Sequence, residues 1–301
     1  MANIVLLFLC LAIGMALRAA KRVPDNAHVA INAFIVHASL PALILSQIHK
    51  VELTPGLLSA AMMPWILFAL SAAIFALVGH FRSSPPATTG ALILTAGLGN
   101  TSFVGLPMIE SFYGSSGLPV GILIDQLGTY LVLSTLGITV ACLYSGGSAS
   151  GREIAYRVAT FPPFIALLLA LALSSVEYPA WLTEVLHRLS TTLAPLALVS
   201  VGLQLRLDQL GGNKSSLGLG LAFKLGIGPA LLAVVYLALL QQTGETTQVT
   251  LFEAAMGPQI GGAIVAVQYG LNPTLVTLMV GIGITLSFAT LPLWWFALRA
   301  I

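Results

Sequence analysis

Charged residues are scarce in this sequence. Only 12 lysines and arginines and 10 aspartates and glutamates occur in 301 residues, so charged side chains make up 7% of the chain. A soluble domain carries roughly a quarter charged residues, because its surface must be solvated by water. Hydrophobic residues reach 57%, which is more apolar surface than a water-soluble fold can bury. The composition excludes a soluble protein and predicts an integral membrane protein that contacts the lipid bilayer.

Cysteine is nearly absent, and the basic residues are few. Cys10 and Cys142 both lie in apolar stretches, which argues against a disulfide framework or a metal site, and no cofactor is expected. A net charge of +2 offers no basic patch for nucleic acid. The apolar runs are continuous and do not alternate with polar residues, so they predict helices and not a transmembrane β-barrel.

Long apolar runs are what the sequence does contain. A transmembrane helix needs about 20 mostly apolar residues, and ten segments come close to this requirement. They are Ala2–Leu17, Val29–Ile48, Ala61–Gly79, Thr88–Phe112, Pro119–Tyr144, Ala155–Ser175, Leu182–Gln204, Leu217–Leu240, Val249–Tyr269 and Pro273–Leu298. The predicted fold class is therefore all-α integral membrane, with ten transmembrane helices.

The distribution of basic residues predicts the orientation. Cytoplasmic loops are enriched in Lys and Arg. The odd-numbered connections hold Arg18, Lys21, Arg22, Arg82, Arg152, Arg157, Arg206 and Lys214. The even-numbered connections and the termini hold only Lys50, Arg188 and Arg299. This asymmetry predicts that both termini face the outside.

The two halves of the chain carry similar signals in the same order. Ser39-Leu40-Pro41 in the second span has a counterpart in Leu193-Ala194-Pro195 in the seventh. The fourth span ends with Phe112-Tyr113-Gly114 and the ninth ends with Gln268-Tyr269-Gly270, and a proline follows each shortly afterwards. These correspondences predict that five helices are repeated.

The predicted repeats comprise residues 1–145 and 146–301, joined by the Gly/Ser-rich loop Ser145–Gly151. An odd number of spans in each unit forces the second copy to be inverted in the membrane. Inverted repeats of this kind are typical of secondary transporters, which bind their substrates near the bilayer midplane at the repeat interface.

The fourth and ninth spans are interrupted near the middle. The fourth reads Gly97-Leu98-Gly99-Asn100-Thr101-Ser102-Phe103-Val104-Gly105-Leu106-Pro107, and the ninth reads Glu253-Ala254-Ala255-Met256-Gly257-Pro258-Gln259-Ile260-Gly261-Gly262. Proline removes a backbone donor and glycine lowers the cost of a bend. Unpaired backbone groups at this depth are tolerated only when buried in protein or lining a wet cavity.

A simple kink is one interpretation of each break. The matched positions, with the amides and hydroxyls of Asn100, Thr101, Ser102 and Gln259 beside them, favour a binding site. The N-termini of the second half-helices present the positive ends of helix dipoles, which suits an anion.

Both halves also contain short motifs, which differ from one half to the other. The first half contains Ile31-Asn32-Ala33-Phe34 with Pro41, Gly99-Asn100-Thr101, Gly105-Leu106-Pro107 and Tyr113-Gly114. The second half contains Gly228-Pro229-Ala230, Ala254-Ala255-Met256-Gly257-Pro258-Gln259 and Leu291-Pro292. In order and spacing these motifs resemble the auxin efflux carrier family. Its plant members move auxin, and its bacterial members include malate and malonate permeases.

The resemblance implies a fold like that of the bile acid symporters, with inverted repeats and crossed discontinuous helices four and nine. A scaffold of residues 1–60 and 146–210 would hold a transport domain of residues 61–145 and 211–301, which would move as an elevator. Members of the family form homodimers. The resemblance also implies an organic-acid permease of the inner membrane of a bacterium.

In this family the asparagine at Asn100 contacts the substrate carboxylate, and the prolines at the crossing shape the site. Gly257 before Pro258, and Gly261-Gly262 after it, stand where plant members are bulkier, which favours a small organic acid over an indole-sized one. The expected substrate is malate, malonate or another mono- or dicarboxylate, or an auxin-like acid. The candidate substrate-binding residues are Asn100, Thr101, Ser102, Gly105, Pro107, Gly257, Pro258, Gln259 and Gly261.

Ionisable residues inside the membrane are functional candidates because burying them is costly. Asp125, next to Gln126, is either a proton- or cation-coupling carboxylate or a structural one that pairs with Lys224 or with other neighbours. Lys224 is expected to snorkel to the interface in preference to contacting substrate.

Three further titratable residues lie within the spans. Glu110 and Glu253 are expected near the outer ends of the broken helices, solvated by interfacial water, with ion coupling as the alternative. A lone histidine such as His37 is more often packed and hydrogen-bonded than a proton relay.

Two other functional classes compete with transport. An intramembrane enzyme would need a metal motif or a paired nucleophile and base, and the sequence has no H-E-x-x-H, G-x-S-x-G or P-loop. A channel would need a filter or a charged sensor helix, and neither pattern occurs. We therefore predict a non-enzymatic secondary active transporter. Its expected partners are a small carboxylate, a coupling proton or sodium ion, the bilayer and a second copy of the chain, with no nucleic acid.

Overall fold

The computed structural model describes residues 2–48, 54–146, 152, 156, 159–204 and 214–301. These residues form helices, with no β-strand among them. Lys50, Arg157, Arg206 and all but the first two residues of the loop Ser145–Gly151 lie outside the described residues.

Most of the predicted spans appear as apolar helices. In the described chain, six helical stretches are long and apolar enough to cross a membrane: Ala27–Ile48, Pro55–Phe81, Ser115–Ser145, Ala180–Leu203, Lys214–Leu239 and Pro273–Leu298. Two shorter apolar stretches are Phe8–Ala19, within α1 (Ala2–Ala19), and α11 (Pro162–Ala172). The structure supports an all-helical membrane protein, and the ten-span inverted repeat remains a prediction.

The fourth and ninth predicted spans are each divided into short helices. The fourth comprises α5 (Pro86–Gly97), η2 (Thr101–Gly105) and α6 (Leu106–Phe112). The ninth comprises α16 (Glu245–Ala254) and α17 (Ile260–Gln268). Neither has a continuous stretch long enough to cross the membrane, which agrees with the predicted interruptions.

Several of the long stretches alternate between α-helical and π-helical turns. The first is α2 (Ala27–Phe34), η1 (Ile35–Ser39) and α3 (Leu40–Ile48). The second follows η3 (Ser115–Gly117) and consists of α7 (Leu118–Leu123), η4 (Ile124–Thr129), α8 (Tyr130–Val132), η5 (Leu133–Gly137) and α9 (Ile138–Ser145). The third is α14 (Lys214–Ala222), η6 (Phe223–Ile227), α15 (Gly228–Ala233) and η7 (Val234–Leu239). Such π-helical turns are rare and occur frequently at functional sites.

Local sequence signals explain where the longest helices begin. Thr54 precedes α4 (Pro55–Phe81), and its hydroxyl oxygen accepts a hydrogen bond from the Leu57 N–H at 3.3 Å. Asn272 precedes α18 (Pro273–Leu298), and its side chain accepts one from the Leu275 N–H at 3.2 Å. A polar cap followed by proline at the first helical position is a preferred helix start.

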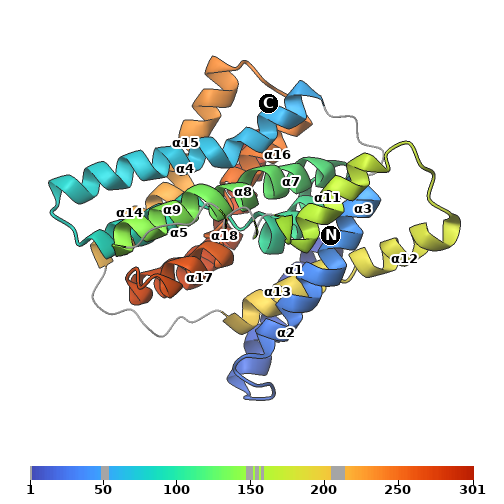
Figure 1. The fold of residues 1–301 in the computed structure, drawn as a ribbon, viewed down its shortest axis with the longest axis horizontal. Helices are drawn as coiled ribbons and strands as arrows, with labels where there is room; N and C mark the ends of the chain where they lie inside the picture. The colour runs from blue at the N-terminus through green and yellow to red at the C-terminus, as the bar shows by residue number, and fades with distance from the viewer. Residues whose placement is uncertain (1, 49–53, 147–151, 153–155, 157–158, 205–213) are drawn as a thin grey trace.

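The helices form two groups (Figure 1). One group contains α1, α2, α3, α11, α12 (Ala180–Ser190) and α13 (Leu193–Gln204), in which α1 packs on α13 and α3 packs on α11 and α12. The other contains α4, α5, α9, α14, α15, α16, α17 and α18, in which α4 and α9 both pack on α5. Contacts of α1 and α13 with α6, and of α3 with α7, join the two groups.

Two glycines allow the backbones of α1 and α13 to meet. A Cβ atom on Gly14 would overlap the carbonyl oxygen of Val199, and one on Gly202 would overlap that of Leu11. Small residues at such positions let membrane helices approach closely, where van der Waals packing stabilises their association.

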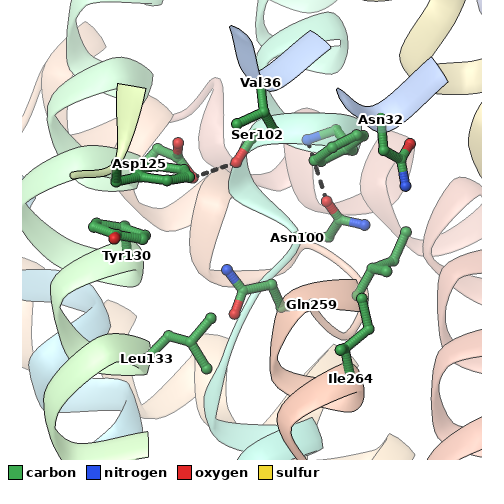
Figure 2. A pocket seen from close by; sticks show the side chains of 13 residues that line it. Asn32, Val36, Asn100, Ser102, Asp125, Tyr130, Leu133, Gln259 and Ile264 are labelled. Atoms are coloured by element: carbon green, nitrogen blue, oxygen red, sulfur yellow. Dashed lines mark hydrogen bonds between the residues drawn. The ribbon is translucent and has the colours of Figure 1, made fainter. Parts of the chain in front are cut away.

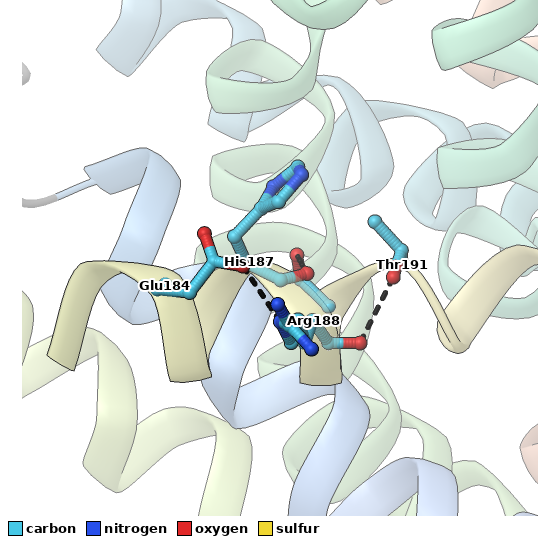
Figure 3. A network of polar contacts seen from close by, with 5 residues as sticks. Glu184, His187, Arg188 and Thr191 are labelled. Carbon is cyan, nitrogen blue, oxygen red and sulfur yellow. Dashed lines mark hydrogen bonds and ion pairs between the residues drawn. The ribbon is translucent and has the colours of Figure 1, made fainter. Parts of the chain in front are cut away.

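The exposed face of α12 carries a small polar network (Figure 3). Arg188 Nε donates to Glu184 Oε1 at 2.6 Å, and the Thr191 hydroxyl donates to the Arg188 carbonyl oxygen at 2.9 Å. The Arg188 and Glu184 side chains are 77% and 57% exposed, so their ion pair contributes at most about 1 kcal/mol to stability.

Candidate functional site

The two interrupted segments meet at their breaks. Gly99 and Pro258 form an isolated antiparallel backbone bridge between the first and second halves of the chain. Proline has no N–H and disfavours helical geometry at the residue before it. Pro258 therefore stops α16 from continuing. A turn at Ala255 follows the helix, and the chain is extended at Gln259, directly before α17.

Backbone hydrogen bonds on both sides of this bridge fix the crossing. The Asn100 N–H donates to the Gly257 carbonyl oxygen at 2.8 Å, and the Gln259 N–H donates to the Leu98 carbonyl oxygen at 3.1 Å. Each break thus satisfies backbone groups of the other, as groups buried far from water must. Asn100 and Gln259 each lie directly before a new helix.

A cavity of about 250 Å³ lies against the crossing. Figure 2 shows Asn100 and Gln259 from the two breaks facing into it, with Tyr130 and Leu133 on one side and Ile264 on another. Its lining residues are Asn32, Val36, Asn100, Ser102, Phe103, Asp125, Tyr130, Leu133, Phe161, Gln259, Ile260, Gly261 and Ile264. These described lining residues include six side chains that carry a polar group, the Tyr130 hydroxyl among them, and no lysine, arginine or histidine.

The amides at the crossing have unused hydrogen-bonding capacity. The Asn100 side-chain oxygen accepts from the Phe103 N–H at 3.2 Å and so caps η2. Asn100 is 1% exposed, and neither its Nδ2 nor the Oε1 of Gln259 has a partner. Buried polar atoms are almost always paired, so unpartnered amide atoms at a cavity indicate that a ligand or water completes them.

Asp125 forms the most polar part of the cavity wall. Its Oδ1 accepts hydrogen bonds from the Thr101 hydroxyl at 2.5 Å and the Ser102 hydroxyl at 2.6 Å. Its Oδ2 accepts from Gln126 Nε2 at 2.6 Å. Asp125 as a whole is 3% exposed, and its carboxyl group joins η4 to the first turn of η2. The sequence left two kinds of structural partner open for Asp125, Lys224 or other neighbours. In the structure its hydrogen-bond partners are Thr101, Ser102 and Gln126.

The structure brings part of the predicted substrate set to the cavity. Asn100, Ser102, Gln259 and Gly261 line it. Thr101 does not, and reaches it only through Asp125.

Four predicted residues lie elsewhere. Gly105, Pro107, Gly257 and Pro258 are buried and do not line the cavity. A Cβ atom on Gly257 would lie 2.9 Å from the Cα of Ile284, so this glycine allows close packing on α18. Gly257 thus packs against α18 and does not contact the cavity. Gly105 faces the Glu253 carboxyl group.

Two of the coupling candidates are placed differently from expectation. Glu253 was expected to contact interfacial water, and Lys224 to reach the interface, but both are 0% exposed. Lys224 Nζ donates to the Ala254 carbonyl oxygen at 2.9 Å, so it binds the C-terminal end of α16. Both Glu253 oxygens are buried without a hydrogen-bond partner.

The remaining candidates fall in three environments. Gln126 is buried and serves Asp125, with its own Oε1 unpartnered. Glu110 is exposed, as expected, and lines a second cavity of about 100 Å³ together with His187. His37 is exposed and hydrogen-bonded to the Ala33 carbonyl oxygen through Nδ1 at 2.9 Å, and it does not line the main cavity.

Some lining residues were not singled out as site residues from the sequence. The Asn32 side-chain oxygen accepts a hydrogen bond from the Ser200 hydroxyl. The rings of Tyr130 and Phe161 stack with centroids 3.9 Å apart and planes at 12°. Asn32 could have been found as an amide inside an apolar span, whereas nothing in the local sequence of Phe161 distinguishes it from residues that face lipid.

Two broken helices that meet beside a cavity with a few polar side chains, in an all-helical membrane protein, are typical of secondary transporters. The family model described as "Membrane transport protein" matches residues 1–295. The chain therefore belongs to this family of transporters, the auxin efflux carrier family whose motifs it resembles, and such proteins are not enzymes.

Curated relatives agree with this assignment. The chain is 29% identical over 268 residues to an uncharacterized transporter of Methanothermobacter thermautotrophicus, covering 88% of this chain and 87% of the relative. It is 26% identical over 273 residues to an uncharacterized transporter of Methanocaldococcus jannaschii, with the same coverage of each chain. Both relatives come from archaea.

Proposed function

We propose that this transporter is a secondary active carrier of a small organic anion, which binds by its carboxylate at the crossing. The unpartnered Nδ2 of Asn100, buried at the cavity wall beside Gln259, is the observation that carries the proposal. An amide nitrogen supplies two N–H donors, and Asn100 stands at the N-terminus of η2, where the helix dipole favours negative charge.

The size and lining of the cavity favour a small acid such as malate, malonate or another mono- or dicarboxylate, with an auxin-like acid as the larger alternative. Pockets for drug-sized ligands measure roughly 300–1,000 Å³, and this cavity measures about 250 Å³. Asn100 and Gln259 would hold the carboxylate, while Val36, Leu133 and Ile264 would contact the rest of the molecule.

We propose an elevator mechanism in which the group of helices around the crossing moves against the other. In this proposal the scaffold, residues 1–60 and 146–210, includes the group of α1, α2, α3, α11, α12 and α13. The transport domain, residues 61–145 and 211–301, includes the group around the crossing. Asn32, Val36 and Phe161 line the cavity from the scaffold side, so movement of the crossing would carry Asn100 and Gln259 past them. The same proposal includes the inverted five-helix repeat and a homodimer. It also includes a location in the cytoplasmic membrane with both termini outside, and coupling to a proton or sodium ion.

Asn100→Asp tests the site most sharply. Aspartate keeps the oxygen that accepts from the Phe103 N–H but has no N–H to donate and adds a negative charge. Hydrogen bonds to charged groups contribute about 1.5–3 kcal/mol, so we expect transport of the acid to fall by about 10- to 100-fold or more. Asn26→Asp is the matched control, because Asn26 is exposed and makes no side-chain capping bond.

The measurement begins with thermal unfolding of the purified protein in the presence of malate, malonate or indole-3-acetate, with and without sodium. Counterflow of the radiolabelled acids in proteoliposomes then measures transport. Saturable exchange by the wild type and its loss in Asn100→Asp support the proposal. Undiminished exchange by Asn100→Asp would refute the site, current without saturation would indicate a channel, and chemical conversion of the acid would indicate an enzyme.

A further inference from the structure

A second polar group lies at the crossing outside the cavity. Glu253, in the last turn of α16, is 0% exposed and does not line the cavity. Both of its carboxyl oxygens lack a hydrogen-bond partner. Burying an ionised carboxylate with no hydrogen bond is very costly in free energy. The position of Glu253 therefore calls for a functional explanation.

The space occupied by the Glu253 carboxyl group is made by glycine. A Cβ atom on Gly105 would lie 2.5 Å from Oε1 and 2.6 Å from Oε2, and one on Gly121 would lie 3.5 Å from Oε1. Gly105 belongs to η2, which also carries the Thr101 and Ser102 hydroxyls that bind Asp125. The same turn thus binds Asp125 at the cavity and makes space for the Glu253 carboxyl group.

Lys224 is the basic residue beside this buried carboxyl group. It is 0% exposed, its Nζ donates to the Ala254 carbonyl oxygen, and a Cβ atom on Gly99 would lie 3.4 Å from Nζ. Lys224 therefore sits against both breaks. It interacts electrostatically with Glu253 but does not hydrogen-bond to its carboxyl oxygens.

Other charged groups near Glu253 are few. Asp125 and Lys224 are the charged residues that act on it. The described elements packed on α16 are α4, α7, α15, α18 and η3, and their only titratable side chain of the Asp, Glu, Lys, Arg or His type is His80, in the last turn of α4. Glu245 lies in the opposite, first turn of α16.

The environment of Glu253 suits a proton better than a metal cation. A hard cation requires several oxygen ligands, and the two glycines that face the carboxyl group, Gly105 and Gly121, offer no side-chain oxygen. One proton, in contrast, needs only one carboxyl oxygen and removes the negative charge that burial penalises.

We propose that Glu253 is the proton-binding group that couples transport to proton movement, with Lys224 as the countercharge when the proton leaves. This inference rests on the proposed carboxylate transport. The Glu253 carboxylate takes up one H⁺ from one side of the membrane and releases it to the other, and no other bond forms or breaks. Without the proton, the Lys224 ammonium balances the carboxylate.

The two sites influence each other through charge. Asp125 lines the cavity and also acts electrostatically on Glu253. An anion that binds beside Asp125 adds negative charge near Glu253, so anion binding and proton binding at Glu253 favour each other. Such coupling is reciprocal by thermodynamic necessity, and it makes the anion and the proton move together.

Infrared difference spectroscopy tests the proton site without any substrate. The carbonyl stretch of a protonated, buried carboxyl group is recorded while wild-type protein is titrated over about pH 5 to 9. We expect a titrating band in the wild type and in Glu253→Asp, which keeps a carboxyl group, and its loss in Glu253→Gln. Asp125→Asn is the matched control and should keep the band. A band that persists in Glu253→Gln, or no titration in the wild type, overturns the inference.

Transport in proteoliposomes tests the coupling, with radiolabelled malate and malonate as probes. We expect a proton gradient to drive accumulation by the wild type, while Glu253→Gln retains counterflow but accumulates the acid at least about tenfold less, equivalent to about 1.4 kcal/mol of lost driving force. Equal proton-driven accumulation by Glu253→Gln overturns the inference and leaves the proposed function intact. A titrating Glu253 in a protein that moves neither acid would refute the proposed function and leave the proton site supported.

Discussion

Two buried carboxyl groups flank the crossing, and their surroundings are opposite. Asp125, on the cavity side, accepts hydrogen bonds from Thr101, Ser102 and Gln126. Glu253, which does not line the cavity, accepts none. Three donors fix the Asp125 carboxyl group in the wall of the site, while no hydrogen bond holds the Glu253 carboxyl group, which fits the proton-binding role proposed for it.

The contrast arises from the residues opposite each group. Asp125 faces hydroxyls in the first turn of η2, whereas Glu253 faces Gly105 at the end of the same turn. Hydroxyls supply donors and glycine supplies only space. A single π-helical turn thus determines how both carboxyl groups are held.

Replacing each carboxyl group with its amide should give the largest difference in stability between the two sites. Asp125→Asn removes the negative charge and one of the two acceptor oxygens, so either Gln126 or the two hydroxyls must reorient to pair with the new NH₂ group. We expect a loss of about 2–3 kcal/mol of stability, as for hydrogen bonds to charged groups. Glu253→Gln breaks no hydrogen bond seen in the structure and should cost less than about 1 kcal/mol. Thermal unfolding of both variants in detergent measures the difference, and equal losses would remove the contrast.

Removing the buried cation should have the next largest effect. Lys224→Met leaves the Ala254 carbonyl oxygen without its donor, and an unsatisfied buried group costs about 1–3 kcal/mol. We expect a loss near 1–2 kcal/mol, reduced when Glu253→Gln is already present because the carboxylate then needs no countercharge. A double-mutant cycle on thermal unfolding measures this coupling. Strictly additive losses would show that Lys224 does not sense Glu253.

Single hydroxyl deletions should have the smallest effect. Thr101→Val and Ser102→Ala each remove one of three donors to Asp125, and an ordinary hydrogen bond contributes about 0.5–1.5 kcal/mol. We expect losses of about 1 kcal/mol each and weaker binding of the acid by less than about tenfold. Thr139→Val is the control, because exposed Thr139 bonds only to the Thr135 carbonyl oxygen of its own helix. A loss in Thr101→Val no larger than in Thr139→Val would show that the bond to Asp125 contributes no more than an exposed hydrogen bond within one helix.

Features that depend on local sequence were predictable. The predicted last span coincides with α18 at Pro273–Leu298, because proline and a preceding asparagine mark its start. The breaks beside Asn100 and Gln259 were also predicted, since glycine and proline interrupt helices whatever surrounds them. The polar residues beside these breaks pointed to the cavity.

Features that depend on which face of a helix packs inward were not predictable. The depth of Glu253 along its span suggested contact with water, but its face of α16 packs against Gly105 and Gly121. Lys224 has a stem long enough to snorkel, yet the carbonyl group at the end of α16 binds it. Phe161 joins the cavity through a stacking contact with a residue far away in the sequence. Hydropathy indicates how deep in the membrane a residue lies, but it does not indicate which residues it contacts.

The bridge between Gly99 and Pro258 consists of main-chain atoms, as do the hydrogen bonds of Asn100 and Gln259 beside it. Side-chain substitution at positions 100 and 259 leaves these bonds in place. The crossing is therefore a backbone frame that does not depend on these two side chains. If they bind the substrate as proposed, relatives can acquire new substrate preferences by changing them without altering the backbone that positions them.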